Sequence, residues 1–155
     1  MNIASLELFI DAAKAIFVEI GFSDLNITTD TDNGKKYDII ASIGITGEFS
    51  GFLLIRSDLQ SSMNFINKML SNIGMESEET DFGKFHKEAF GEILNQISGR
   101  ATMLLETKGI DSNITPPTIL KGNNISISTY NAAKTLQKTI TGTFGCFNLL
   151  VGIKE

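Results

Sequence analysis

Hydrophobic residues recur at helical spacing in three segments of the chain, which predicts helices over residues 5–20, 59–72 and 81–108. Gly21 follows the first segment and is expected to end that helix. The run Ser57-Asp58-Leu59-Gln60 resembles a capping box and predicts that the second helix begins at its end. The third segment is the longest of the three.

Runs rich in β-branched and aromatic residues lie between and after these helices, where they predict strands. Clustered strands beside long helices indicate an α+β fold, with the helices packed on a mostly antiparallel sheet. The expected strands cover residues 24–31, 37–46, 49–57, 113–119, 124–130, 135–144 and 146–153.

A weak internal repeat divides the chain into two halves. The pattern I-T-G-x-F-x-x-F-x-L occurs at residues 45–54 and again at 140–149. In each half a glycine precedes an Asn-Ile-Thr run, which begins at Asn26 and at Asn113. Each half therefore has the order helix, glycine, strand and strand pair, which predicts two weakly repeated halves.

The polar face of the third helix groups four residues. At about 100° per residue, Glu88, Glu92, Asn95 and Gly99 fall within about 60° of one another. Asn and Gly are poor helix formers, so their place in mid-helix needs a reason, and function is one candidate. A merely solvated face is the alternative. The opposite, apolar face holds Phe82, His86, Ala89, Phe90, Ile93, Ile97, Ala101 and Leu104.

Composition and charge limit the classes of function. With 155 residues, of which 42% are hydrophobic, the chain is long enough for one domain, expected over residues 1–155. The net charge of −5 and the lack of a basic stripe argue against nucleic acid and anionic membranes as partners. No signal peptide and no membrane-spanning run is recognised, so a cytoplasmic location without membrane insertion is expected. The single cysteine, Cys146, allows no internal disulfide and is expected to be a small buried residue of a strand.

The side chains of Glu92 and Asn95 are neighbours on a helix because they are three positions apart. The carboxylate can pair with a lysine or arginine of a partner. The carboxamide both donates and accepts hydrogen bonds, so it can orient a water molecule, although it is no strong base. Such a pair suits hydrolysis of an acyl phosphate, where positioning and charge stabilisation dominate.

The motif Glu88-x3-Glu92-x2-Asn95, followed by Gly99 and Pro117, resembles the CheC/CheX/FliY family of bacterial chemotaxis phosphatases. The single Glu-x-x-Asn site is similar to CheX rather than to CheC, which has two sites. Two features depart from the family pattern: Glu88 stands where Asp or Ser is usual, and Pro117 comes one residue early.

This resemblance implies that the chain hydrolyses the aspartyl phosphate of a CheY-like response regulator. By the same resemblance, Asn95 would orient the attacking water and Glu92 would pair with a lysine of the regulator. Glu88, Gly91, Gly99 and Pro117 would face the partner, the two glycines by keeping the helix face low or, alternatively, by packing. No metal or other cofactor is expected on this chain, since the phosphorylated regulator would supply Mg²⁺. A homodimer is implied as well.

The repeat bears on the number of sites. When the two halves are aligned, Ala4 and Glu7 of the first helix correspond to Glu92 and Asn95. The first half therefore lacks the Glu/Asn pair, and one functional face per chain is expected. Two alternatives stay open. The chain could be a non-catalytic CheX-like module that docks a response regulator or a flagellar switch protein, or a plain interaction domain unrelated to chemotaxis.

Overall fold

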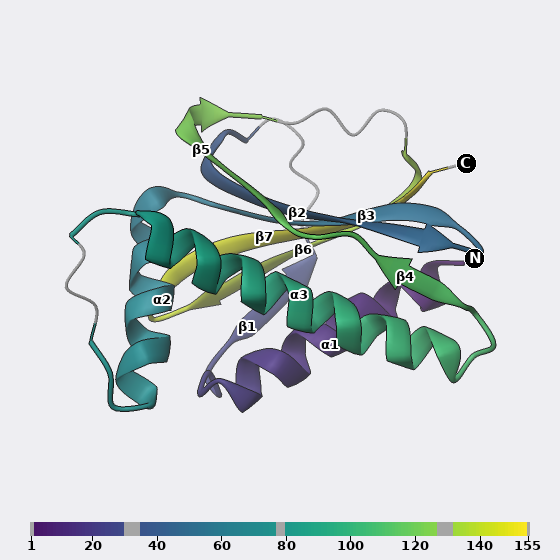
Figure 1. The fold of residues 1–155 in the computed structure, drawn as a ribbon, viewed down its shortest axis with the longest axis horizontal. Helices are drawn as coiled ribbons and strands as arrows, with labels where there is room; N and C mark the ends of the chain where they lie inside the picture. Colours follow the sequence, from purple (N-terminus) through teal and green to yellow (C-terminus); the bar gives the residue numbers. More distant parts are fainter. Residues whose placement is uncertain (1, 30–34, 77–79, 127–131, 155) are drawn as a thin grey trace.

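The fold is an α+β sandwich in which three helices cover one antiparallel sheet (Figure 1), as seen in a computed structural model that describes residues 2–29, 35–76, 80–126 and 132–154. The predicted fold class is confirmed. The helices of these described ranges are α1 (Ile3–Glu19), α2 (Leu59–Asn72) and α3 (Lys84–Glu106). Their strands are β1 (Asn26–Thr29), β2 (Tyr37–Gly47), β3 (Ser50–Ser57), β4 (Ser112–Ile114), β5 (Thr118–Ile125), β6 (Ala132–Gly142) and β7 (Gly145–Lys154).

The seven described strands form a sheet in the order β1-β6-β7-β3-β2-β4, and β5 also pairs with β2. Each of these pairings is antiparallel. The long helices α1 and α3 lie together under one face of the sheet, and α2 stands at its end (Figure 1). The apolar faces of the helices and the sheet thus enclose one core.

The internal repeat is visible in the strand pairing. The two predicted strand pairs form the hairpins β2–β3 and β6–β7, which join through β3 and β7 in the middle of the sheet. Each half also gives its first short strand to the other half: Asn26 lies opposite Thr141, and Asn113 lies opposite Thr46. These two registers are equivalent in the repeat, so the halves are related by an approximate two-fold rotation.

Helix starts differ from the sequence prediction because the capping residues differ. Asn2 caps α1 by accepting a hydrogen bond from the Ser5 amide at 3.0 Å, so α1 begins at Ile3 instead of at residue 5. Helix α2 covers the predicted residues, but its cap is Asp58, whose carboxylate accepts from the Ser61 amide at 2.7 Å. The expected Ser57 cap is wrong, because the Ser57 hydroxyl donates to backbone carbonyls instead.

The prolines divide one predicted strand into two. The run expected at 113–119 ends as β4 at Ile114, and β5 begins after Pro117. Proline cannot donate to a sheet ladder, so the chain leaves the sheet there and joins it again along β2. The strand expected at 124–130 is therefore wrong in its first part, where Ile125 ends β5, and the rest lies mostly outside the described residues.

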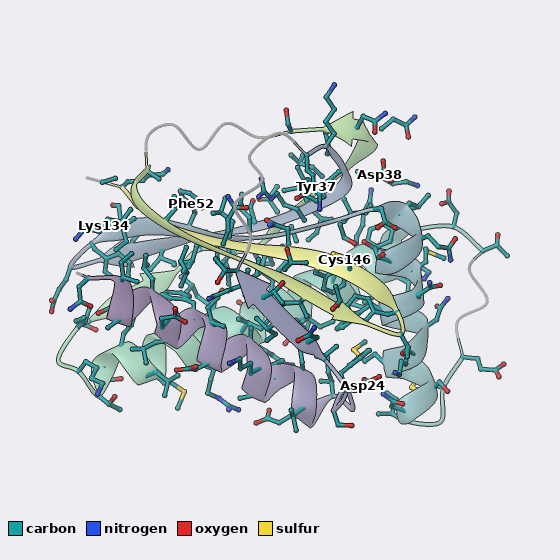
Figure 2. The ribbon with its side chains drawn as sticks, turned by 180° about the vertical axis from the view of Figure 1, so that it is seen from behind. Asp24, Tyr37, Asp38, Phe52, Lys134 and Cys146 are labelled. Carbon is teal, nitrogen blue, oxygen red and sulfur yellow. The ribbon has the colours of Figure 1, made fainter. Side chains whose placement is uncertain are left out.

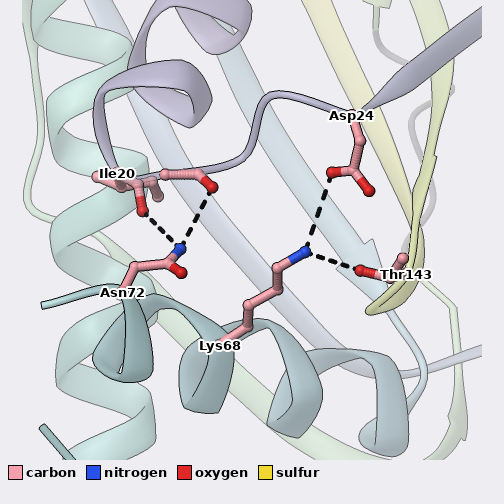
Figure 3. Close-up of polar contacts among 6 residues, drawn as sticks. Ile20, Asp24, Lys68, Asn72 and Thr143 are labelled. Atoms are coloured by element: carbon pink, nitrogen blue, oxygen red, sulfur yellow. Dashed lines mark hydrogen bonds and ion pairs between the residues drawn. The ribbon is translucent and has the colours of Figure 1, made fainter. Parts of the chain in front are cut away.

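Contacts of α2 join three parts of the fold (Figure 3). The Asn72 carboxamide donates to the carbonyls of Ile20 and Gly21 and so satisfies the end of α1. The Lys68 ammonium lies 3.9 Å from Asp24 and donates to the Thr143 hydroxyl at 2.8 Å. Helix α2 is thereby fixed to the loop after α1 and to the β6–β7 turn.

The opposite end of α2 is held by the sheet. Asp38 of β2, labelled beside the start of α2 in Figure 2, accepts a hydrogen bond from the Leu59 amide at 3.0 Å. Cys146 also lies near this end, where its amide donates to the Ser61 hydroxyl at 3.1 Å. The Cys146 side chain is only partly buried, so the expectation of a buried residue is wrong.

No helix in the described part of the chain is long and apolar enough to cross a membrane.

Candidate functional site

Helix α3 carries the predicted motif on its outer face. It begins at Lys84 and ends at Glu106, so the expected bounds of 81 and 108 are wrong by two or three residues. The buried face matches the prediction closely, with Ala89 and Leu104 only partly buried. The predicted apolar position of His86 is confirmed, since the ring is fully buried beside Phe82 and Phe85. The fully or nearly fully buried residues of the helix are His86, Phe90, Gly91, Ile93, Leu94, Ile97, Ser98, Ala101 and Leu105.

A groove of about 700 Å³ runs between α3 and the segment that joins β4 to β5. This segment runs alongside α3, above the helix in the view of Figure 1, where the sheet lies. The structure thus brings together most of the predicted site residues, although more than twenty positions separate the helix motif from the prolines. The groove is lined by Lys87, Glu88, Gly91, Glu92, Asn95, Ile114, Thr115, Pro116, Pro117 and Ile119.

The two predicted glycines have different surroundings. A Cβ atom on Gly91 would lie 3.4 Å from Cγ of Pro117, so Gly91 is a packing position at the floor of the groove. A Cβ atom on Gly99 would meet no heavy atom within 4 Å outside the helix backbone. Gly99 does not line the groove and lies one turn beyond Asn95 on open surface.

Thr115 holds the far wall of the groove against the sheet. Its hydroxyl accepts a hydrogen bond from the Gly44 amide at 2.8 Å, and its own amide donates to the Gly44 carbonyl at 2.9 Å. A Cβ atom on Gly44 would lie only 3.0 Å from the Thr115 hydroxyl oxygen, so glycine permits this approach. The wall beside Pro117 is therefore fixed to β2 by one side-chain and one backbone hydrogen bond.

Hydrogen bonds from a lysine of β5 fix the start of α3. Lys121 of β5 donates to an Asp81 carboxylate oxygen and to the Phe82 carbonyl, each at 3.2 Å. The hydrogen bond from the Phe82 amide, followed by the contact with Lys121, lowers the pKa of Asp81 below its usual value of 3.8. Helix and strand are thus connected at this end of the groove.

The three polar site residues differ in their contacts. The Glu88 carboxylate lies 3.9 Å from the Lys84 ammonium, one helical turn away. The exposed Glu92 carboxylate accepts a hydrogen bond from the Gln96 carboxamide at 3.3 Å. Asn95 is half-buried, and within the described ranges its carboxamide has no hydrogen-bond partner. Its donor and acceptor atoms are thus available at the edge of the groove.

Several groove residues were missed from the sequence. Lys87 is one of them, and its spacing could have placed it in the site. It lies four positions before Gly91 and eight before Asn95, on the same side of the helix. No local signal placed Thr115 and Ile119 in the groove, because Thr115 is held by Gly44 of β2 and Ile119 by the pairing of β5 with β2. Among the described residues, no group of three or more His, Cys, Asp or Glu side chains is arranged to hold a metal ion.

Comparison with known proteins gives one family. The family model described as chemotaxis phosphatase CheX matches residues 39–141. A relative from Thermotoga maritima named CheY-P phosphatase CheX is 30% identical over 94 residues, which are 61% of this chain and 58% of the relative. The match thus spans a little over half the length of that curated relative.

Solved structures share the fold over nearly the whole chain. A CheC-like superfamily protein from Shewanella sp. PV-4 superposes with a TM-score of 0.83 at 22% identity, covering 100% of both chains. The Borrelia burgdorferi structure described as a CheX-CheY-BeF3-Mg²⁺ complex gives a TM-score of 0.74 at 22% identity, covering 97% of each chain. At these identities the structures establish the fold alone.

Proposed function

The chain belongs to the CheX family of chemotaxis phosphatases, and from this premise we propose that it hydrolyses the aspartyl phosphate of a CheY-like response regulator. The resemblance seen in the sequence is thereby confirmed at the level of the family. The name of the Thermotoga relative and the partner in the Borrelia complex support the same substrate. The observation that carries the proposal is the half-buried Asn95 carboxamide, which has no hydrogen-bond partner among the described residues and lies beside the exposed Glu92 on one helix face.

Asn95 would position the nucleophile. Its carboxamide oxygen would accept a hydrogen bond from a water molecule and hold the water in line with the P–O bond to be broken. The water oxygen forms the new bond to phosphorus, the aspartyl carboxylate leaves, and inorganic phosphate is released. An acyl phosphate has a good leaving group, so this step needs orientation more than it needs a strong base.

Glu92 would fix the pose of the partner. Its carboxylate is exposed and points away from the core, where a lysine of the regulator can reach it. The weak contact with Gln96 at 3.3 Å is easily exchanged for a charged partner. Glu88 and Pro117 would border the same contact, and Gly91 would let Pro117 lie close to the helix.

The phosphorylated regulator would bring the Mg²⁺ ion that neutralises charge on the phosphoryl group, so this chain would need no metal of its own. A homodimer, which the family resemblance implies, and a cytoplasmic location, which was expected from the sequence, are the remaining parts of the proposal.

The test is the decay of a phosphorylated CheY-like receiver protein with and without this chain. We expect catalytic acceleration by the wild type and a loss of about a hundredfold or more in Asn95→Ala and Glu92→Gln. Matched controls are Asn67→Ala, an exposed asparagine of α2, and Glu106→Gln, at the end of α3. Both controls should retain wild-type activity, since neither residue lines the groove.

The opposing result is equally clear. If the wild type binds phosphorylated receiver proteins without speeding their decay, the chain is a docking module and the hydrolytic proposal fails. If Asn67→Ala and Asn95→Ala lose activity alike, the assigned role of Asn95 fails.

A further inference from the structure

Lys87 occupies the groove on the same side of α3 as Asn95. Lys87, Gly91 and Asn95 follow each other at intervals of four residues, so they form one stripe facing the β4–β5 segment. Eight residues of helix separate Lys87 from Asn95, which is about 12 Å along the axis. A partner that reached Asn95 and filled the groove would therefore also meet Lys87.

The charge of Lys87 is available to such a partner. Two nearby lysines form ion pairs. The Lys84 ammonium lies 3.9 Å from the Glu88 carboxylate, and the Lys121 ammonium lies 3.2 Å from the Asp81 carboxylate. Lys87 is exposed and, in the part of the chain that the structure describes, forms no ion pair. The groove thus presents one uncompensated cation beside an apolar wall.

We propose that Lys87 is a partner-recognition residue that pairs with an acidic side chain at the rim of the receiver protein's phosphorylated pocket. The inference rests on the proposed function. A site that holds Mg²⁺ and an acyl phosphate is built with carboxylates, so the surface around it is acidic. This chain carries a net charge of −5 and places Glu88 and Glu92 at the contact, so an acidic partner would otherwise meet mainly repulsion.

The distance decides what Lys87 contributes. About 12 Å of helix axis separates the backbone of Lys87 from that of Asn95, so Lys87 is placed to contact a part of the partner away from the reacting atoms. It acts on the partner's surface and through attraction within a Debye length, so it raises the affinity and the association rate. The turnover of the bound complex should not depend on it.

The experiment measures binding and turnover separately. Binding of a CheY-like receiver protein activated with beryllofluoride and Mg²⁺ is measured for the wild type, Lys87→Glu and Lys87→Gln at low and high salt. The control is Lys14→Glu, the same change of charge on an exposed position of α1 outside the groove. Steady-state hydrolysis of the phosphorylated receiver gives kcat and KM for the same proteins.

We expect Lys87→Glu to raise Kd and KM about fivefold or more, with a smaller rise in Lys87→Gln and less than about a twofold change in kcat. The affinity of Lys87→Glu should also depend less on salt than that of the wild type. Equal effects of Lys87→Glu and Lys14→Glu would overturn the inference, as would a fall in kcat with unchanged Kd. If the wild type binds the receiver without hydrolysing it, the proposed function is refuted, and the Kd values of the variants alone test the role of Lys87. If the wild type binds no receiver, the proposed contact between Lys87 and the receiver is refuted.

Discussion

The substitution Gly99→Ala tests whether this glycine serves the stability of the fold or the contact with a partner. In the middle of a helix, alanine is more favourable than glycine by about 0.8–1.0 kcal/mol. Because the new Cβ would meet no heavy atom within 4 Å, nothing in the fold offsets this gain. For a chain of this length, that free energy raises the unfolding temperature by about 2–4 °C.

The activity of the same variant should move in the opposite direction. Gly99 lies one turn after Asn95, where an approaching partner would press on the helix surface. An extra methyl group in a close contact costs about 1–3 kcal/mol, which is roughly a 5- to 160-fold loss in kcat/KM. A protein that is more stable and less active would show that glycine is kept at this position for the partner.

Gly91→Ala is the matched comparison on the same helix. Its Cβ would lie 3.4 Å from Cγ of Pro117, which is an ordinary van der Waals contact, so we expect a gain in stability similar to that at Gly99. The assay is thermal unfolding by circular dichroism, together with hydrolysis of the phosphorylated receiver protein. An unchanged or lower unfolding temperature in Gly99→Ala would refute the assignment of an open helix surface, and unchanged kcat/KM would refute the close approach of a partner.

Four further variants test the core, the turns and the charge at the start of α3. Phe65→Ala should lower the free energy of unfolding, measured by urea titration, by about 3–5 kcal/mol. The Phe65 ring stacks on Phe22 with the ring centroids 4.3 Å apart and contacts three further phenylalanine rings. A loss below about 2 kcal/mol would contradict this packing. Gly145→Ala should lower the free energy of unfolding by about 1–3 kcal/mol, since φ is +132° and a Cβ would overlap Ser61. Gly74→Ala should lower it less, because φ is +76° but the space around the residue is open. Equal losses in the two variants would show that backbone strain acts alone, without the overlap with Ser61. The lowered pKa of Asp81 stabilises the fold above the usual value of 3.8, and this contribution disappears as the pH falls through the folded-state pKa. The stability gap between the wild type and Asp81→Asn, measured by denaturation at several pH values, should therefore be constant near neutrality and close in acid; a gap that widens in acid would contradict the sign.

Local sequence patterns were enough to predict the three helices, the two hairpins and the face of α3 that carries the motif, but not the division at the prolines. Residues three and four positions apart meet on a helix whatever surrounds it, so the spacing of Glu92 and Asn95 placed both on one exposed face. The same periodicity predicted the buried position of His86. The repeated strand pattern likewise predicted both hairpins, because alternation and turn residues act over a few positions.

The groove could not be predicted in this way. Its far wall exists because β5 pairs with β2 and because Thr115 is hydrogen-bonded to Gly44, a contact across 71 positions. The exchange of β1 and β4 between the halves is another long-range pairing that no local pattern encodes.

Sequence alone thus determined that Glu92 and Asn95 lie side by side on one helix face, since helix periodicity is a local property. Tertiary structure alone decided what surrounds that pair. It made Gly91 a packing position and Gly99 an open one, although both are glycines on the same helix, because Pro117 reaches only the first of them. It also placed Lys87 in the groove, since the course of β5 over α3 is set by sheet pairing between residues far apart in the chain.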